Sequence, residues 1–129
     1  MTMTPAQHWS DNPVAPKPGF ILCHQDELSE SSGKEFIFHT ENQTFRMMVF
    51  LVEGRSIAYI NSCKHFHGTP LNPNGVGNFL HPENASLIRC GVHGATYALK
   101  TGACLSEDCE GESLDPVPTS IIEGQVVIG

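Results

Sequence analysis

Short apolar runs separated by turn residues are the main pattern along this chain. The runs are rich in Val, Ile and Phe, which is typical of β-strands, and a brief helix is expected at Gln25–Leu28. Glu123-Gly124 separates the last two runs as a tight hairpin turn would. The pattern therefore predicts an all-β fold. The predicted strands are Phe20–Cys23, Glu35–Phe38, Phe45–Val52, Ser56–Ile60, Ser86–Arg89, Thr119–Ile122 and Gln125–Ile128.

The length and the order of these runs predict one domain with an insertion. A chain of 129 residues that is 40% hydrophobic forms one domain with a modest core. Residues 1–18 contain four prolines and little apolar periodicity, so we expect an irregular N-terminal arm there and a single domain over 19–129. Residues 61–98 interrupt the strands as an insertion. Within them Asn72–Ala85 is rich in Pro, Gly and Asn, which predicts a surface excursion.

Charge and hydropathy exclude several classes of partner. The formal net charge is −7, from 7 basic and 14 acidic residues, which disfavours nucleic acid and anionic membrane and suits a basic protein face. The chain has no apolar run of membrane-spanning length, and its N-terminus does not resemble an export signal. We therefore expect a cytoplasmic protein. The acidic residues around Glu107–Glu112 form either a solvated loop or a docking patch.

Two short segments bring cysteine and histidine together. Cys63-Lys64-His65 and Cys90-Gly91-Val92-His93 each offer one thiolate and one imidazole. This is the ligand set of a Rieske [2Fe-2S] centre, in which both cysteines bind one iron and both histidines bind the other. Both spacings, in this order, arise by chance in roughly a few per cent of shuffled chains of this composition. We therefore expect one [2Fe-2S] cluster per chain, bound by Cys63, His65, Cys90 and His93.

The flanking residues resemble the Rieske ferredoxin family. Gly68-Thr69-Pro70-Leu71 follows the first pair, Gly94-Ala95-Thr96-Tyr97 follows the second, and the similarity extends from about Phe20 to Ile128. It implies an antiparallel β-sandwich base with a small inserted cluster-binding subdomain of two loops on three short strands. It also implies a proline-containing loop at Leu114–Pro118 that covers the cluster. The implied function is soluble one-electron transfer from a flavin-containing reductase to an acceptor such as an oxygenase. The chain itself is then a carrier and not an enzyme.

The chain departs from the family pattern in its first ligand loop. Members usually read Cys-x-His-x-Gly, whereas Cys63-Lys64-His65-Phe66-His67-Gly68 has one extra residue. His67 is therefore a second candidate ligand. We favour His65, because its spacing from Cys63 matches the family. The 24 residues between the two ligand pairs are also more than most relatives have.

Other positions bear on the reduction potential and on the remaining cysteines. High-potential relatives donate hydrogen bonds to the cluster from a serine and a tyrosine; here Tyr97 is present and Ala95 replaces the serine. The chain also lacks their loop disulfide, so it resembles the lower-potential class. Cys104 and Cys109 could form a disulfide, but free thiols are the expectation in a reducing cytosol. Cys23 is expected to be a buried small hydrophobe.

The sequence leaves two alternatives open. Structural zinc also accepts two cysteines and two histidines, although zinc knuckles usually pair cysteine with cysteine. The small subunit of nitrite reductase resembles this fold without the ligands and acts as a structural subunit. A reddish-brown purified protein distinguishes the electron carrier from both alternatives.

Overall fold

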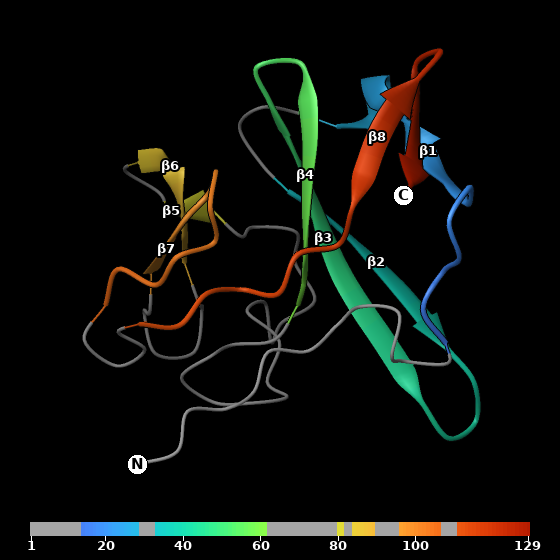
Figure 1. The fold of residues 1–129 in the computed structure, drawn as a ribbon, viewed down its shortest axis with the longest axis horizontal. Helices are drawn as coiled ribbons and strands as arrows, with labels where there is room; N and C mark the ends of the chain where they lie inside the picture. The colour runs from blue at the N-terminus through green and yellow to red at the C-terminus, as the bar shows by residue number, and fades with distance from the viewer. Residues whose placement is uncertain (1–13, 29–32, 62–79, 82–83, 90–95, 107–110) are drawn as a thin grey trace.

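The described strands form three antiparallel sheets (Figure 1). The computed structural model describes residues 14–28, 33–61, 80–81, 84–89, 96–106 and 111–129. In this part of the chain each sheet has three strands, in the orders β1-β9-β8, β2-β3-β4 and β5-β6-β7. The strands are β1 Ile21–His24, β2 Lys34–His39, β3 Thr44–Val52, β4 Arg55–Ile60, β5 Leu80–His81, β6 Asn84–Arg89, β7 Thr96–Ala98, β8 Thr119–Ile122 and β9 Gln125–Ile128.

β3, the central strand of the β2-β3-β4 sheet, is buried on both faces from Met47 to Phe50, because alternate residues of a strand point to opposite sides. Met48 and Phe50 of β3 face what we call the first core, whereas Met47 and Val49 face the second core. The first core contains Met48, Phe50, Tyr59, Leu80, Ile88, Tyr97, Leu99 and Leu114. The second core contains Cys23, Leu28, Phe45, Met47, Val49, Ala58, Ile60, Val117, Val126 and Ile128. The β2-β3-β4 sheet thus packs on the β5-β6-β7 sheet through the first core and on the β1-β9-β8 sheet through the second.

Two hairpins have two-residue turns with positive φ at both positions. Glu123 and Gly124 have φ of 51° and 80°, and Glu53 and Gly54 have φ of 51° and 77°. Such turns match the twist of the paired strands, and their second position favours glycine. The hairpin predicted at Glu123-Gly124 is confirmed, and it joins β8 to β9.

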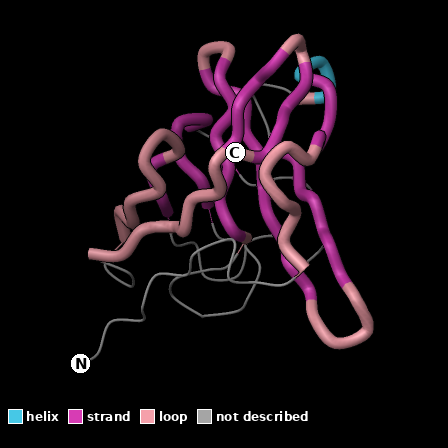
Figure 2. Tube along the Cα trace, turned by 45° about the vertical axis from the view of Figure 1, so that its right-hand side comes forward, coloured by secondary structure: helices cyan, strands magenta, loops and turns pink. Residues whose placement is uncertain are grey.

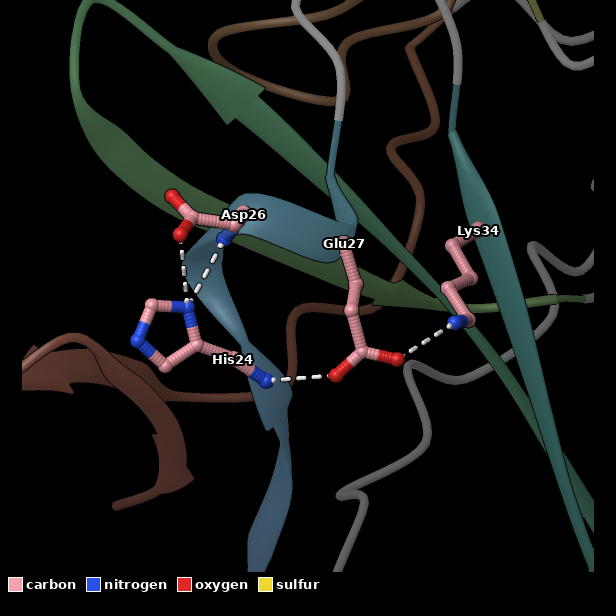
Figure 3. Close-up of polar contacts among 4 residues, drawn as sticks. All are labelled: His24, Asp26, Glu27 and Lys34. Carbon is pink, nitrogen blue, oxygen red and sulfur yellow. Dashed lines mark hydrogen bonds and ion pairs between the residues drawn. The ribbon is translucent and has the colours of Figure 1, made fainter.

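A short 3₁₀ helix, η2 (Gln25–Glu27), follows β1 (Figures 2 and 3). The amide of Asp26 donates to Nδ1 of His24 at 3.1 Å, and the amide of His24 donates to Oε2 of Glu27 at 2.8 Å. Lys34 Nζ lies 3.3 Å from the other oxygen of Glu27. The hydrogen bond from the His24 amide, which has the largest effect, and the contact with Lys34 lower the pKa of Glu27. Ionised Glu27 therefore stabilises the fold at pH values above the pKa that it has in the unfolded chain. This contribution is lost as pH falls through the lowered pKa of the folded chain.

The predicted all-β fold is confirmed, and each predicted strand is present with small shifts at its ends. The apolar pattern did not predict β5 and β7, although the resemblance implies three short strands in the inserted subdomain. The excursion predicted for residues 72–85 is wrong at its C-terminal end, because Leu80 is buried in the first core and pairs with Ile88, and β6 begins at Asn84. Residues 14–18 contain no strand or helix, although Val14 packs against the second core. The boundaries of the arm and of the inserted subdomain stay predictions.

Candidate metal centre

The predicted ligands Cys63, His65, Cys90 and His93, and the alternative His67, lie outside the described residues. Their assignment therefore stays a prediction. The structure does describe the strands that lead into and out of both loops. Among the described residues, no group of three or more His, Cys, Asp or Glu side chains could hold a metal ion.

The strand that leads to the first loop, β4, is paired at its end with the proline-containing segment. The amide of Ile60 donates to the carbonyl of Asp115 at 2.8 Å, and the amide of Val117 donates to the carbonyl of Ala58 at 2.9 Å. Tyr59 and Pro116 form the antiparallel bridge between these two bonds. Leu114–Pro118 therefore runs along the last residues before the loop that contains Cys63.

The second loop is closed by a strand pair. Arg89, the last residue of β6, pairs with Thr96, the first residue of β7. Cys90 and His93 belong to the residues between them. The far side of β7 is also paired, since the amide of Leu105 donates to the carbonyl of Thr96 and Ser106 Oγ accepts from the Thr96 amide, both at 2.8 Å. Both ends of this loop are thus fixed by backbone pairing.

The first core joins the strands that flank the two loops. Tyr59 of β4, Ile88 of β6 and Tyr97 of β7 are all buried in it. In addition, the hydroxyl of Tyr59 donates to the carbonyl of Leu99 at 2.7 Å, just beyond β7. The strands that flank the two Cys/His pairs are therefore held in fixed positions relative to each other. A single cluster with ligands from both loops requires this. Two thiolates and two imidazoles also fit the ligand chemistry of a Rieske centre.

Burial raises the pKa of Tyr59 to about 12, from an ordinary value of 10.0. The stability that the neutral phenol contributes is complete below pH 10 and is lost as pH rises through 12. We expect the tyrosinate absorbance of the wild type minus that of Tyr59→Phe to rise with a midpoint near 12. A midpoint near 10 would contradict the burial of this hydroxyl.

The cysteines with described surroundings differ from each other. Cys23 is buried in the second core as predicted, and burial raises the pKa of its thiol. Cys104 is disulfide-bonded, so the expectation of a free thiol there is wrong. Its partner lies outside the described residues. The amide of Cys104 donates to the carbonyl of Glu112 at 2.9 Å.

A polar network at the end of β4 was not predicted. Arg46 Nε and Nη2 donate to Oε2 and Oε1 of Glu35 at 2.7 and 2.9 Å, and Asn61 Nδ2 donates to Oε2 of Glu35 at 2.6 Å. Asn61 is 4% exposed and precedes Cys63 by two residues. The available signal was a pair of opposite charges, Glu35 and Arg46, within two predicted neighbouring strands that are otherwise mostly apolar.

A family model described as the Rieske [2Fe-2S] domain matches residues 19–120. No curated protein matches the chain in sequence.

Among solved structures, the ferredoxin of Sphingomonas yanoikuyae B1 is similar, with 23% identity, a TM-score of 0.60, and 85% of this chain and 96% of that chain covered. The ferredoxin of carbazole 1,9a-dioxygenase from Nocardioides aromaticivorans IC177 has 18% identity, a TM-score of 0.66, and coverage of 88% and 98%. A third similar chain is in a complex of reduced oxygenase and oxidized ferredoxin in carbazole 1,9a-dioxygenase, with 18% identity, a TM-score of 0.64, and coverage of 85% and 91%. The structural similarity confirms the antiparallel β-sandwich base, and the family match over most of the sequence shows that the chain belongs to the Rieske [2Fe-2S] domain family.

Proposed function

We propose that this chain is a one-electron carrier that binds one [2Fe-2S] cluster through Cys63, His65, Cys90 and His93. The observation that carries the proposal is the presence of the complete Cys/His ligand set in a chain of the Rieske [2Fe-2S] domain family. When bound, such a cluster accepts and releases one electron, and its histidine ligands raise the reduction potential relative to clusters with cysteine ligands alone. The chain supplies the ligands and a rigid frame for the two loops. This function requires no general acid, base or nucleophile.

The proposed partners are a flavin-containing reductase as electron donor and an oxygenase as acceptor. Support for the acceptor comes from the similar ferredoxins, which belong to or are complexed with carbazole 1,9a-dioxygenase. The formal net charge of −7 suits docking on a basic face of either partner. No helix among the described residues is long and apolar enough to cross a membrane. A cytoplasmic location is part of the proposal.

Metal analysis and spectroscopy of the purified protein test the proposal. We expect a reddish-brown protein with about two iron and two acid-labile sulfide per chain, and a rhombic electron paramagnetic resonance (EPR) signal after reduction. Stoichiometric zinc in a colourless protein would support the zinc-stabilised module instead. A folded colourless protein without metal would support the structural subunit.

The hydroxyl of Tyr97 is expected to raise the reduction potential. Tyr97 is fully buried in the first core on β7, four residues after His93. By resemblance to the family it donates a hydrogen bond to the cluster, and such bonds stabilise the reduced, more negative form. Tyr97→Phe should therefore lower the potential measured by protein-film voltammetry. The wild-type value itself is expected in the lower part of the Rieske interval of roughly −150 to +300 mV.

Tyr59→Phe is the matched control for Tyr97→Phe. It also removes one buried hydroxyl from the first core, but that hydroxyl donates to the carbonyl of Leu99. We expect a much smaller change in potential for Tyr59→Phe. Equal shifts in the two variants would show that the loss of any buried hydroxyl from the first core changes the potential, which would contradict a specific hydrogen bond from Tyr97 to the cluster.

A further inference from the structure

A carboxylate, a guanidinium and an amide from three neighbouring strand regions converge where the first ligand loop begins. Glu35 lies on β2 and Arg46 on β3, and Asn61 directly follows β4. The Glu35 carboxylate accepts both donors of Arg46 and the side-chain amide of Asn61. We call this set the Glu35 network. Its side chains are largely buried, with 9% of Glu35 and 27% of Arg46 exposed.

Strand register places the Glu35 network on the same face of the sheet as the first core. Glu35 of β2 pairs with Met48 of β3. On the other side of β3, Met47 pairs with Ile60. Because the strands are antiparallel, the preceding Arg46 lies opposite the following Asn61. The amide of Asn61 donates to the carbonyl of Arg46 at 2.9 Å, which continues the β3–β4 pairing by one bond. Directly paired residues, and residues two apart on a strand, share a face. The network therefore extends the face of Met48 and Phe50 to the end of β4.

Such a buried polar network fixes the positions of its side chains more than it adds to the stability of the fold. Apolar residues of similar size often stabilise a buried position as well as an ion pair does, because the charged groups must be desolvated. The bidentate contact, by contrast, fixes the relative orientation of two planar groups. The Asn61 amide uses that fixed carboxylate as its acceptor. The side chain and the backbone amide of Asn61 are thus both held, two residues before the candidate ligand Cys63.

We propose that the Glu35 network positions the first ligand loop and thereby holds Cys63 and His65 for cluster binding. This inference rests on the proposed function. Glu35, Arg46 and Asn61 are positioning residues in this proposal, and they act on the cluster through the backbone that leads to its ligands. Without the network, the backbone at the end of β4 should become more mobile, and Cys63, two residues after Asn61, should be held less firmly.

The decisive variant is Asn61→Ala, because it removes the contact to Glu35 without changing net charge. A shift in potential then reports geometry or solvent access and not a lost charge. Ser56→Ala is the matched control: Ser56 lies near the other end of β4 and makes one partly buried side-chain hydrogen bond, to Thr119 Oγ1 at 2.7 Å. Ser56→Ala removes a polar side-chain contact from within β4, and Asn61→Ala removes one from the residue that follows it.

The experiment measures cluster release and spectroscopic signature in the purified, cluster-containing protein. Loss of residues that orient metal ligands typically costs 10- to 100-fold in metal affinity. We expect Asn61→Ala to release iron to an excess of chelator about 10-fold faster than the wild type, with a shifted potential and a broadened EPR signal. Ser56→Ala should stay within about twofold of the wild type in release rate and keep its potential and signal.

Glu35→Gln provides a second route if Asn61→Ala does not fold. It keeps the side-chain volume and should also accelerate iron release. Because the residues act as a unit, Glu35→Gln combined with Asn61→Ala should release iron little faster than the faster single variant.

The outcomes separate this inference from the proposed function. A wild-type protein with a cluster, combined with unchanged release and EPR signals in both single variants, would overturn the positioning role alone. Equal acceleration by Asn61→Ala and Ser56→Ala would show that the Glu35 network acts only through general stability, which also overturns it. A wild-type protein that binds no [2Fe-2S] cluster would overturn the proposed function and this inference with it.

Discussion

His65→Ala is expected to yield a protein without the visible absorbance of a [2Fe-2S] cluster. Removal of one imidazole leaves an iron with an incomplete ligand set, and the spacing of His65 from Cys63 is that of the family. We expect the iron content to fall from about two per chain to near zero, and the EPR signal of the reduced protein to disappear. Iron analysis and absorbance of the purified variant provide the measurement.

His67→Ala is the internal control, because it removes the second imidazole of the same loop. It should retain both the cluster and its spectrum. The reverse result, with a normal spectrum in His65→Ala and none in His67→Ala, would transfer the ligand role to His67. Far-UV circular dichroism of both variants establishes that the β-sheets are intact.

Phe50→Ala is expected to destabilise the protein by about 3–5 kcal/mol, the usual cost of truncating a buried Phe. Phe50 is 1% exposed and lies in the first core, which joins the strands of the two ligand loops. A loss of this size is a large part of the 5–15 kcal/mol by which domains are typically stable. Urea unfolding followed by circular dichroism should show a lower midpoint with little change in slope.

Ile37→Ala is the matched control for Phe50→Ala. Ile37 belongs to the same sheet but is 51% exposed, so its truncation should leave the free energy of unfolding almost unchanged. In Phe50→Ala we also expect faster iron release, because the first core supports both loops. Similar midpoints for the two variants would contradict the packing of Phe50.

The strands could be predicted from sequence where the apolar run was long enough. β3 and β4 are long runs of apolar residues, and the Glu123-Gly124 turn has a residue pattern that favours a hairpin. β5 has two residues and β7 has three, too few for any periodicity to appear. These two strands depend on pairing with β6, which is a tertiary contact.

The candidate ligands could be proposed from sequence because the spacing of cysteine and histidine is local. The Glu35 network could not, because its members are 11 and 26 residues from Glu35 and meet only through strand register. The disulfide at Cys104 was missed for another reason: the expectation rested on the redox state of the compartment and not on the fold.

Because β3 is apolar on both faces, its hydrophobic pattern alone does not fix its register with the neighbouring strands. In a sheet with one apolar face, a shift of one residue exposes the whole core, so the pattern itself selects the register. In β3 such a shift would exchange Met47 with Met48 and Val49 with Phe50 between two cores that both accept apolar groups. Arg46, the charged residue within β3, removes this ambiguity, because a shifted strand would place its guanidinium in the second core, away from Glu35. The ion pair thus penalises the misaligned strand more than it favours the native one.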